Sequence, residues 1–264
     1  MDGTLANNEG KISQSDLLTL HKLGSKGIKR VIATGRNLFS AKKILNETMP
    51  IDFLIFSSGA GIYDWHKREI IKSSYLKSDE IKYIYQYLQS IDTDFMMHYP
   101  IPENHRFFYY VSGKYNPDFE HRLSVYKDFA ERINQNKFKL TTACQFVAVI
   151  PDVSFNFGQV ADDLVNFSVI RTTSPFDKKT LWIEIFPAGV SKGKSAAWLC
   201  HKLNISSSGV LSIGNDYNDL DLLNWSGNSY VVDNAPHALK RKFTVTRSNQ
   251  DSAFMQTVKK FLLI

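Results

Sequence analysis

Helix and strand signals alternate at both ends of the chain, and this alternation limits the choice of fold more than any other feature. Leu17, Leu20 and Leu23 recur at helical spacing behind Ser13, which can cap a helix. The other segments that read as helices or short apolar strands are 28–33, 38–47, 51–56, 181–186, 191–203, 210–213, 230–232, 243–245 and 252–262. Strands that alternate with helices form a parallel sheet covered on both faces. We therefore predict an α/β core with a doubly wound parallel sheet.

The middle of the chain has a different pattern. It holds amphipathic helical segments and aromatic-rich strands such as 107–111 and 145–150. This pattern predicts an α+β unit inserted into the α/β core. We place the core at residues 1–76 and 187–264, and the inserted domain at 77–186.

Composition limits where such a protein works and what it binds. Hydrophobic residues make up 43% of the chain and charged residues 22%, enough apolar surface for a sizeable core. The two cysteines, Cys144 and Cys200, cannot form a disulfide scaffold and suit a reducing compartment.

The charge pattern and the hydrophobic runs limit the partners. The net charge of +6 comes from scattered basic residues, and this scatter does not favour nucleic-acid binding. No uncharged run is as long as a membrane span needs, and no signal peptide is evident at the amino terminus. We expect a cytoplasmic protein that binds no nucleic acid or membrane and needs no obligate protein partner.

Four short polar segments follow predicted strands or open predicted helices, where a parallel sheet presents its functional edge. They are 1–5 (MDGTL), 33–36 (ATGR), 191–193 (SKG) and 214–219 (GNDYND). The Thr34 hydroxyl, the helix amides after it and the Lys192 ammonium can hold a phosphate. The oxygens of Asp2, Asn215, Asp216 and Asp219 are of the type that Mg²⁺ prefers. A cation beside a phosphate clamp is suited to phosphoryl transfer.

In this order the four segments resemble the motifs of the haloacid dehalogenase-like (HAD) hydrolases, in particular the Cof-type sugar-phosphatase branch. Segments 59–64 (GAGIYD) and 232–235 (VDNA) add to the match. The resemblance covers the whole chain, because that branch carries a C2-type α/β cap between its second and third motifs. It implies a Rossmann-like core with a cap that closes over the substrate, and Mg²⁺-dependent hydrolysis of a small phosphate monoester, plausibly a sugar phosphate.

The resemblance also implies residue roles. Asp2 would be the general acid/base and Lys192 the second catalytic residue. Thr34, Gly35, Arg36, Lys192 and Asn218 would bind the substrate, while Asp2, Asn215, Asp216 and Asp219 would hold the metal. Each motif has a simpler interpretation beside this one: a turn at Gly3, a helix cap at Thr34, a solvated lysine at Lys192, and capping by Asn218 and Asp219. We expect Asp221 to face solvent.

Two departures from the family pattern matter. The family's nucleophilic aspartate stands two residues before the acid/base, a position that precedes Met1 and is absent from this chain. We interpret this as an amino terminus assigned too late, and we expect the chain as printed to be impaired or inactive. Asn215 stands where the family usually has a metal-binding aspartate, and Asn adds no negative charge. Ser58 replaces the family's usual asparagine.

Three other functions stay open. The same scaffold could be a catalytically inactive protein that binds a phosphate ligand, which is the main alternative. Residues 188–195 (AGVSKGKS) fit a relaxed phosphate-binding loop with Lys194 as its lysine, which would indicate an ATPase or GTPase. A phosphomutase is a weaker alternative. Substrate identity and oligomeric state do not follow from the sequence.

Overall fold

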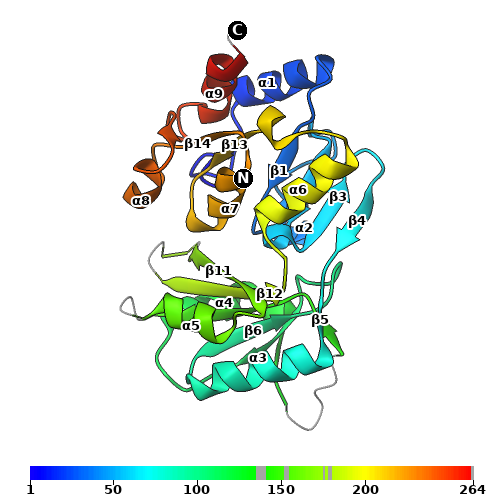
Figure 1. Cartoon of the computed structure of the whole chain (residues 1–264). Helices are drawn as coiled ribbons and strands as arrows, with labels where there is room; N and C mark the ends of the chain where they lie inside the picture. Colours follow the sequence, from blue (N-terminus) through cyan, green and yellow to red (C-terminus); the bar gives the residue numbers. More distant parts are fainter. Residues whose placement is uncertain (135–140, 152–154, 175, 178–179, 263–264) are drawn as a thin grey trace. The chain divides into compact units, whose positions relative to one another are not determined.

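A computed structural model covers the chain and describes every residue except 135–140, 152–154, 175, 178–179 and 263–264. The chain divides into two compact units (Figure 1). Unit 1 comprises Met1–Lys72 and Ser191–Ile264, and unit 2 comprises Ser73–Val190. Unit 2 is thus an insertion between the two halves of unit 1. Among the described residues, no helix combines the length and the apolar character that crossing a membrane requires.

The first half of unit 1 is a sheet with helices on its connections. Its elements are α1 (Gln14–Ser25), β1 (Val31–Ala33), α2 (Leu38–Lys42), β2 (Phe53–Phe56), the 3-10 helix η1 (Ser57–Gly59), β3 (Gly61–Asp64) and β4 (Glu69–Ser73). The strand order is β1-β2-β3-β4, with β1 and β2 parallel and β3 antiparallel to β2. The Ser13 side chain accepts from the Asp16 amide and caps α1, as predicted. The helix predicted at 38–47 ends earlier, at Lys42.

The second half of unit 1 repeats the alternation. Its elements are α6 (Lys192–Lys202), η3 (Ser207–Gly209), β13 (Leu211–Gly214), η4 (Tyr217–Asp219), α7 (Leu220–Trp225), β14 (Asn228–Val231), α8 (His237–Lys240), β15 (Thr244–Val245) and α9 (Ala253–Leu262). Strands β13, β14 and β15 form a parallel sheet in that order. Helix α6 packs through Ala196 and Leu199 against Phe53, Ile55 and Ile62 of the other sheet. The two halves therefore share a core.

The amino terminus lies between the two sheets of unit 1 (Figure 1). β1 and β13 are edge strands, one in each sheet. The Met1 amino group donates to the Ala33 carbonyl at the end of β1, at 3.4 Å. The α/β fold class is confirmed, but the predicted single sheet is present as two sheets. Within the described part of the chain no strand joins them, because residues 1–12 contribute only isolated bridges, between Asp2 and Ala6 and between Ala6 and Ile12.

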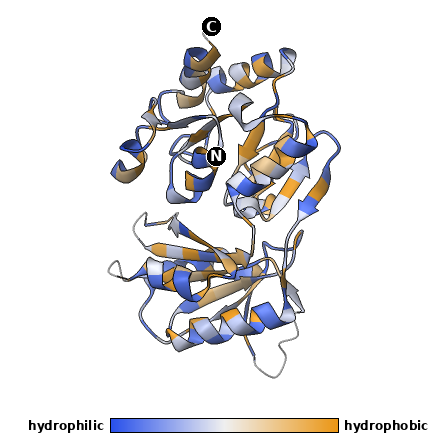
Figure 2. Cartoon of the chain, in the orientation of Figure 1, coloured by the Kyte–Doolittle hydropathy of each residue, from blue (hydrophilic) through white to orange (hydrophobic). Residues whose placement is uncertain are grey.

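Unit 2 is an α+β unit built on a six-stranded sheet. Its elements are β5 (Leu76–Lys77), α3 (Ser78–Ser90), β6 (Asp94–His98), β7 (Phe107–Tyr110), α4 (Pro117–Val125), η2 (Lys127–Phe129), β8 (Ala130–Arg132), β9 (Thr142–Ala143), β10 (Gln145–Ile150), α5 (Phe157–Asp163), β11 (Phe167–Thr173) and β12 (Leu181–Pro187). The sheet order is β11-β12-β10-β6-β7-β8. Ile81, Ile84 and Leu88 of α3 pack against this sheet, while much of the helix is hydrophilic (Figure 2). This packing explains the amphipathic pattern seen in the sequence.

Candidate active site

The four polar segments meet at one edge of unit 1, where strands β1, β2 and β13 end. Thr34 follows β1, and Asn215 follows β13. The Thr4 hydroxyl donates to Oδ1 of Asn215 at 2.9 Å, which joins the first segment to the fourth. Lys192, at the start of α6, reaches Asp219 in the fourth segment. Residues separated by up to 218 positions thus share one site, as the strand pattern predicted.

Lys192 is buried at the centre of this cluster. Its Nζ donates to Oδ1 of Asp219 at 2.6 Å and to Oδ1 of Asn218 at 3.0 Å. The side chain is only 4% exposed, so this is a buried ion pair rather than a surface one. A lysine simply solvated at a helix start does not fit this environment.

The first turn of α6 is fixed by its own cap and by contacts with two other segments. Ser191 caps the helix by accepting from the Lys194 amide. The Ser195 hydroxyl donates to the Gly59 carbonyl at 2.6 Å, and the Gly193 amide donates to Oδ2 of Asp221 at 2.8 Å. These contacts set the direction in which Lys192 projects. The expectation that Asp221 faces solvent is wrong, because its carboxylate caps this amide and its residue is only partly exposed.

Asp219 is the anionic partner of Lys192 in this ion pair. Besides Lys192, its carboxylate accepts from the amides of Asn215 at 2.9 Å and Asp216 at 3.3 Å. Burial raises the pKa of Asp219, but the charge of Lys192 and these hydrogen bonds outweigh burial and hold the pKa below its ordinary value. Gly214 permits this geometry, since a Cβ there would lie 2.7 Å from Cβ of Asp219.

Asp2 is engaged by Arg36. Nε and Nη2 of Arg36 each donate to one carboxylate oxygen of Asp2 at 2.9 Å. Burial raises the pKa of Asp2, but the Arg36 hydrogen bond and the nearby positive charges lower it below its ordinary value. The Arg36 amide in turn donates to Oγ1 of Thr34 at 3.1 Å. Arg36 therefore links the first two predicted motifs. Gly35 lies in the backbone between Thr34 and Arg36.

The Met1 amino group is buried in the same cluster. Burial and the charge of Lys192 lower its pKa below the ordinary value of 8.0, while Asp219 and Asp2 act in the opposite direction. The charged groups that act on it are Lys192, Asp219, Asp2 and Arg36, so the amino end of the printed chain lies inside this cluster.

The predicted metal ligands lie in this cluster, but two of them are already bonded to cations. Asp2 pairs with Arg36 and Asp219 with Lys192. Asn215 accepts from Thr4, and a carboxylate oxygen of Asp216 accepts from the Tyr217 amide at 2.8 Å. Within the described ranges, no group of three His, Cys, Asp or Glu side chains is arranged to hold a metal ion.

Three further hydrogen bonds shape the site, and the sequence contains only a weak signal for them. Nδ2 of Asn234, in the 232–235 segment, donates to the Gly3 carbonyl at 2.9 Å. Ser57 and Ser58 both have positive φ, and their amides donate to the carbonyls of Arg36 and Thr34. The match at 232–235 marked Asn234 as notable without showing what it contacts.

Known proteins match the chain over most of its length. The family model described as haloacid dehalogenase-like hydrolase matches residues 1–258. A putative phosphatase, YxeH of Bacillus subtilis, is 26% identical over 100% of this chain and 96% of its own length. The B. subtilis protein YwtE, named a 5-amino-6-(5-phospho-D-ribitylamino)uracil phosphatase, is 27% identical over 96% of this chain and 92% of its own length.

Solved structures share the fold along the whole chain. BT1666 from Bacteroides thetaiotaomicron, a phosphatase of the HAD superfamily, superposes with a TM-score of 0.81 at 21% identity, covering 100% of this chain and 93% of its own. The HAD subclass IIB sugar phosphatase BT4131 gives a TM-score of 0.78 at 19% identity, with coverage of 100% and 97%. The expected fold and the expected enzyme class, a phosphoric monoester hydrolase, are confirmed. The chain belongs to the haloacid dehalogenase-like hydrolase family.

Proposed function

We propose that this site hydrolyses small phosphate monoesters, sugar phosphates among them, through an aspartyl-phosphate intermediate. The observation that carries the proposal is the buried Lys192 ammonium, which Asp219 and Asn218 hold at the edge where the four polar segments meet. A phosphoryl oxygen is the kind of acceptor that such an oriented ammonium binds. Relatives that match nearly the whole chain are named phosphatases, and one structural neighbour is named a sugar phosphatase.

Lys192, Thr34 and Arg36 would bind the phosphoryl oxygens. The Lys192 ammonium is held by Asp219 and Asn218, so it is oriented before substrate arrives. The Thr34 hydroxyl accepts from the Arg36 amide, which leaves its own proton for a phosphoryl oxygen. Gly35, between Thr34 and Arg36, has no side chain that would keep the phosphate away from the backbone there.

Asp2 would serve as general acid and then as general base. As the ester P–O bond breaks, Asp2 gives a proton to the leaving alcohol oxygen. In the second step it takes a proton from the water that attacks the phosphoenzyme, which releases inorganic phosphate and restores the protonated acid. Arg36 must first give up its contact with Asp2, since that contact favours the ionised carboxylate.

The attacking carboxylate would belong to an aspartate joined directly to Met1, outside the printed sequence. The buried position of the Met1 amino group supports this proposal, because a residue joined there would begin beside Lys192 and Asp219. Asp2 cannot replace it, since displacing the attacking group by two residues destroys in-line geometry.

Mg²⁺ would be the cofactor, held by Asn215, Asp216 and the main-chain carbonyl of Asp2 together with that additional carboxylate. When bound, the ion would offset the negative charge of the phosphoryl group. Because Asn215 contributes no charge and Asp219 is engaged by Lys192, the ion would be bound more weakly than in a site with two free carboxylates.

The test compares the printed chain with one extended by the residues encoded immediately upstream of Met1. We expect the extended chain to release phosphate from sugar phosphates in the presence of Mg²⁺, and we expect EDTA to abolish this release. The printed chain is expected to show none. Lys192→Met in the extended chain is the control for background hydrolysis. Equal activity of the two chains would refute the proposed nucleophile.

A second candidate is a phosphate-ligand binding protein without turnover. It is favoured by the fact that both carboxylates, Asp2 and Asp219, are already neutralised by protein cations. Calorimetric titration with inorganic phosphate distinguishes the two. Binding by both chains with release of phosphate by neither would support the binding protein.

A further inference from the structure

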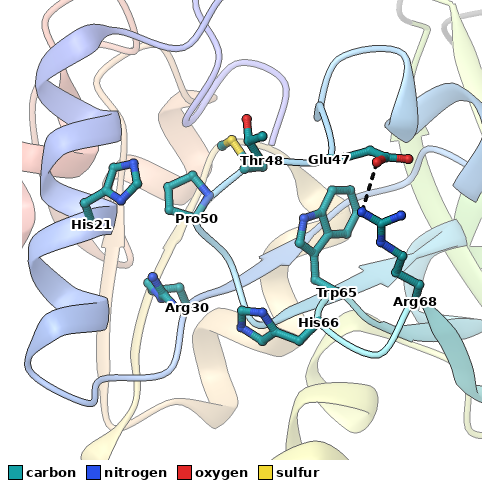
Figure 3. A pocket seen from close by; sticks show the side chains of 9 residues that line it. His21, Arg30, Glu47, Thr48, Pro50, Trp65, His66 and Arg68 are labelled. Carbon is teal, nitrogen blue, oxygen red and sulfur yellow. Dashed lines mark hydrogen bonds and ion pairs between the residues drawn. The ribbon is translucent and has the colours of Figure 1, made fainter.

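A second pocket lies at the opposite end of β1 from the candidate active site. It has a volume of about 380 Å³ and is lined by His21, Arg30, Pro50, Trp65, His66 and Arg68, among others (Figure 3). All of these residues belong to unit 1. Arg30 precedes β1 and Thr34 follows it, so about four extended residues, roughly 13 Å, separate the two sites. The mechanism proposed above uses none of these residues.

The side chain of Trp65 gives this pocket a hydrogen-bond donor for which the described residues offer no acceptor. Trp65 is 8% exposed, and its indole N–H has no acceptor among the described residues. Figure 3 shows the indole nitrogen on the side of the ring that faces Pro50, across the pocket. Its backbone amide is satisfied by the Asp52 carbonyl, and its ring packs edge-on against Tyr63 at 5.7 Å. Buried donors normally have a partner, so an orphaned one indicates an acceptor supplied by a ligand.

Basic groups surround this donor. Nε of Arg30 donates to Oδ2 of Asp52 at 2.9 Å, and Nε2 of His66 lies 3.3 Å from Oδ1 of the same carboxylate. Arg68 pairs with Glu47 at 2.9 Å, and both side chains are more than 60% exposed. A pair this exposed is weak, so an incoming anion can replace Glu47 at Arg68.

Part of the remaining wall is apolar, while His21 and Thr48 add polar groups to it. Met49 is buried, and Pro50 and the Trp65 ring line the space beside it. A pocket of this size, with polar groups and one apolar side, suits one small polar organic molecule.

We propose that this pocket binds a small organic oxyanion, a phosphate or carboxylate group on a compact ring or apolar body. An oxygen of the anion accepts from the Trp65 indole N–H, and Arg68 supplies the positive charge that balances it. The body of the ligand lies against Pro50 and Met49. Because this site is separate from Lys192 and Thr34, its ligand is not the substrate of the proposed reaction.

The test is NMR of the indole N–H groups in the full chain. The four tryptophans give four resonances, and Trp65→Phe assigns the one of interest. Phenylphosphonate and benzoate are the probes, because neither can be hydrolysed. We expect at least one to shift the Trp65 resonance saturably while leaving that of Trp198 in place. A response to phenylphosphonate alone identifies a phosphate-type ligand, and a response to benzoate alone a carboxylate.

Variants separate this pocket from the candidate active site. Arg68→Gln is expected to weaken probe binding about tenfold, as loss of a charged hydrogen bond does. Arg36→Gln, at the other end of β1, is expected to leave the Trp65 response unchanged. The proposal is overturned if neither probe shifts Trp65, if sodium chloride shifts it equally, or if Arg36→Gln abolishes the response while Arg68→Gln does not.

Discussion

At the scale of single residues, the Lys192–Asp219 pair determines the character of the candidate active site. Both side chains are less than 10% exposed and lie 2.6 Å apart. Taking two charges out of water is costly, and the pair persists because Asn218 and two backbone amides share in it. The pair therefore fixes Lys192 in place. Removing one partner leaves the other as a buried charge without a counterion.

We predict that Lys192→Met lowers the free energy of unfolding by about 3–5 kcal/mol, because it leaves the buried Asp219 carboxylate without its cation. The double variant Lys192→Met/Asp219→Leu is expected to recover part of this loss. Urea unfolding of both variants measures the difference. Equal losses in the single and double variants would show that the ion pair is not what Lys192 contributes.

The Met1 amino group leads to a prediction about pH. Its pKa is below 8.0 in the folded protein, so the unfolded chain binds more protons between the two pKa values. Stability therefore rises with pH across that interval and levels off above about pH 8. We expect this slope in urea unfolding of the printed chain and not in a chain extended at Met1, whose amino group lies elsewhere. Identical slopes would contradict the burial of this group.

At the scale of elements, the candidate site depends on how closely η1 approaches the start of α6. Gly59 has a φ of +106°, and a Cβ there would lie 2.2 Å from the Ser191 carbonyl oxygen. The Ser195 hydroxyl bonds to the Gly59 carbonyl in the same contact. This approach joins the end of β2 to the turn that carries Lys192.

We predict that Gly59→Ala destabilises the protein by about 3 kcal/mol, since backbone must move to admit the methyl group. Gly10→Ala is the matched control: its φ is +76°, and a Cβ there meets nothing within 4 Å. The control should cost about 1 kcal/mol from left-handed strain alone. Thermal unfolding compares the two, and equal losses would show that the contact with Ser191 tolerates a methyl group.

Local signals predicted most of the elements that support the site. The Ser13 cap, the apolar run that forms β2 and the helix that begins at the 191–193 segment are each encoded within a few residues. The partners of the polar groups are not encoded in this way. Asp2 pairs with Arg36, 34 positions away, and Asp221 caps Gly193, 28 positions away. The pocket around the unpaired Trp65 N–H is likewise lined by Pro50 and Arg30, which only the fold brings to the same pocket as Trp65.

At the scale of the whole molecule, the chain holds two units with separate cores. In unit 2, Phe146 is fully buried among residues of α3, β6 and β12. In unit 1, Phe56 is equally buried, and its ring fills the space beside Gly61. A core that each unit completes for itself makes each a candidate for independent unfolding.

We predict that Phe146→Ala lowers the stability of unit 2 by about 3–5 kcal/mol and leaves unit 1 nearly unchanged. The tryptophans report on the two units separately, because Trp182 lies in unit 2 and Trp198 in unit 1. Urea unfolding followed in variants that keep only one of them should show the Trp182 transition moving further. Phe56→Ala should reverse the order. Transitions that move together in both variants would show a single cooperative unit.

The buried Met1 amino group also has a practical consequence for handling the protein. Its nearest neighbours are Ala33, Lys192 and Asp219 rather than solvent. An affinity tag fused directly to Met1 of the printed sequence, in place of any upstream residues, would therefore thread its linker through the region where phosphate is expected to bind. A tag attached behind α9, at the opposite end of the polypeptide, avoids this obstruction and is the better choice for purification.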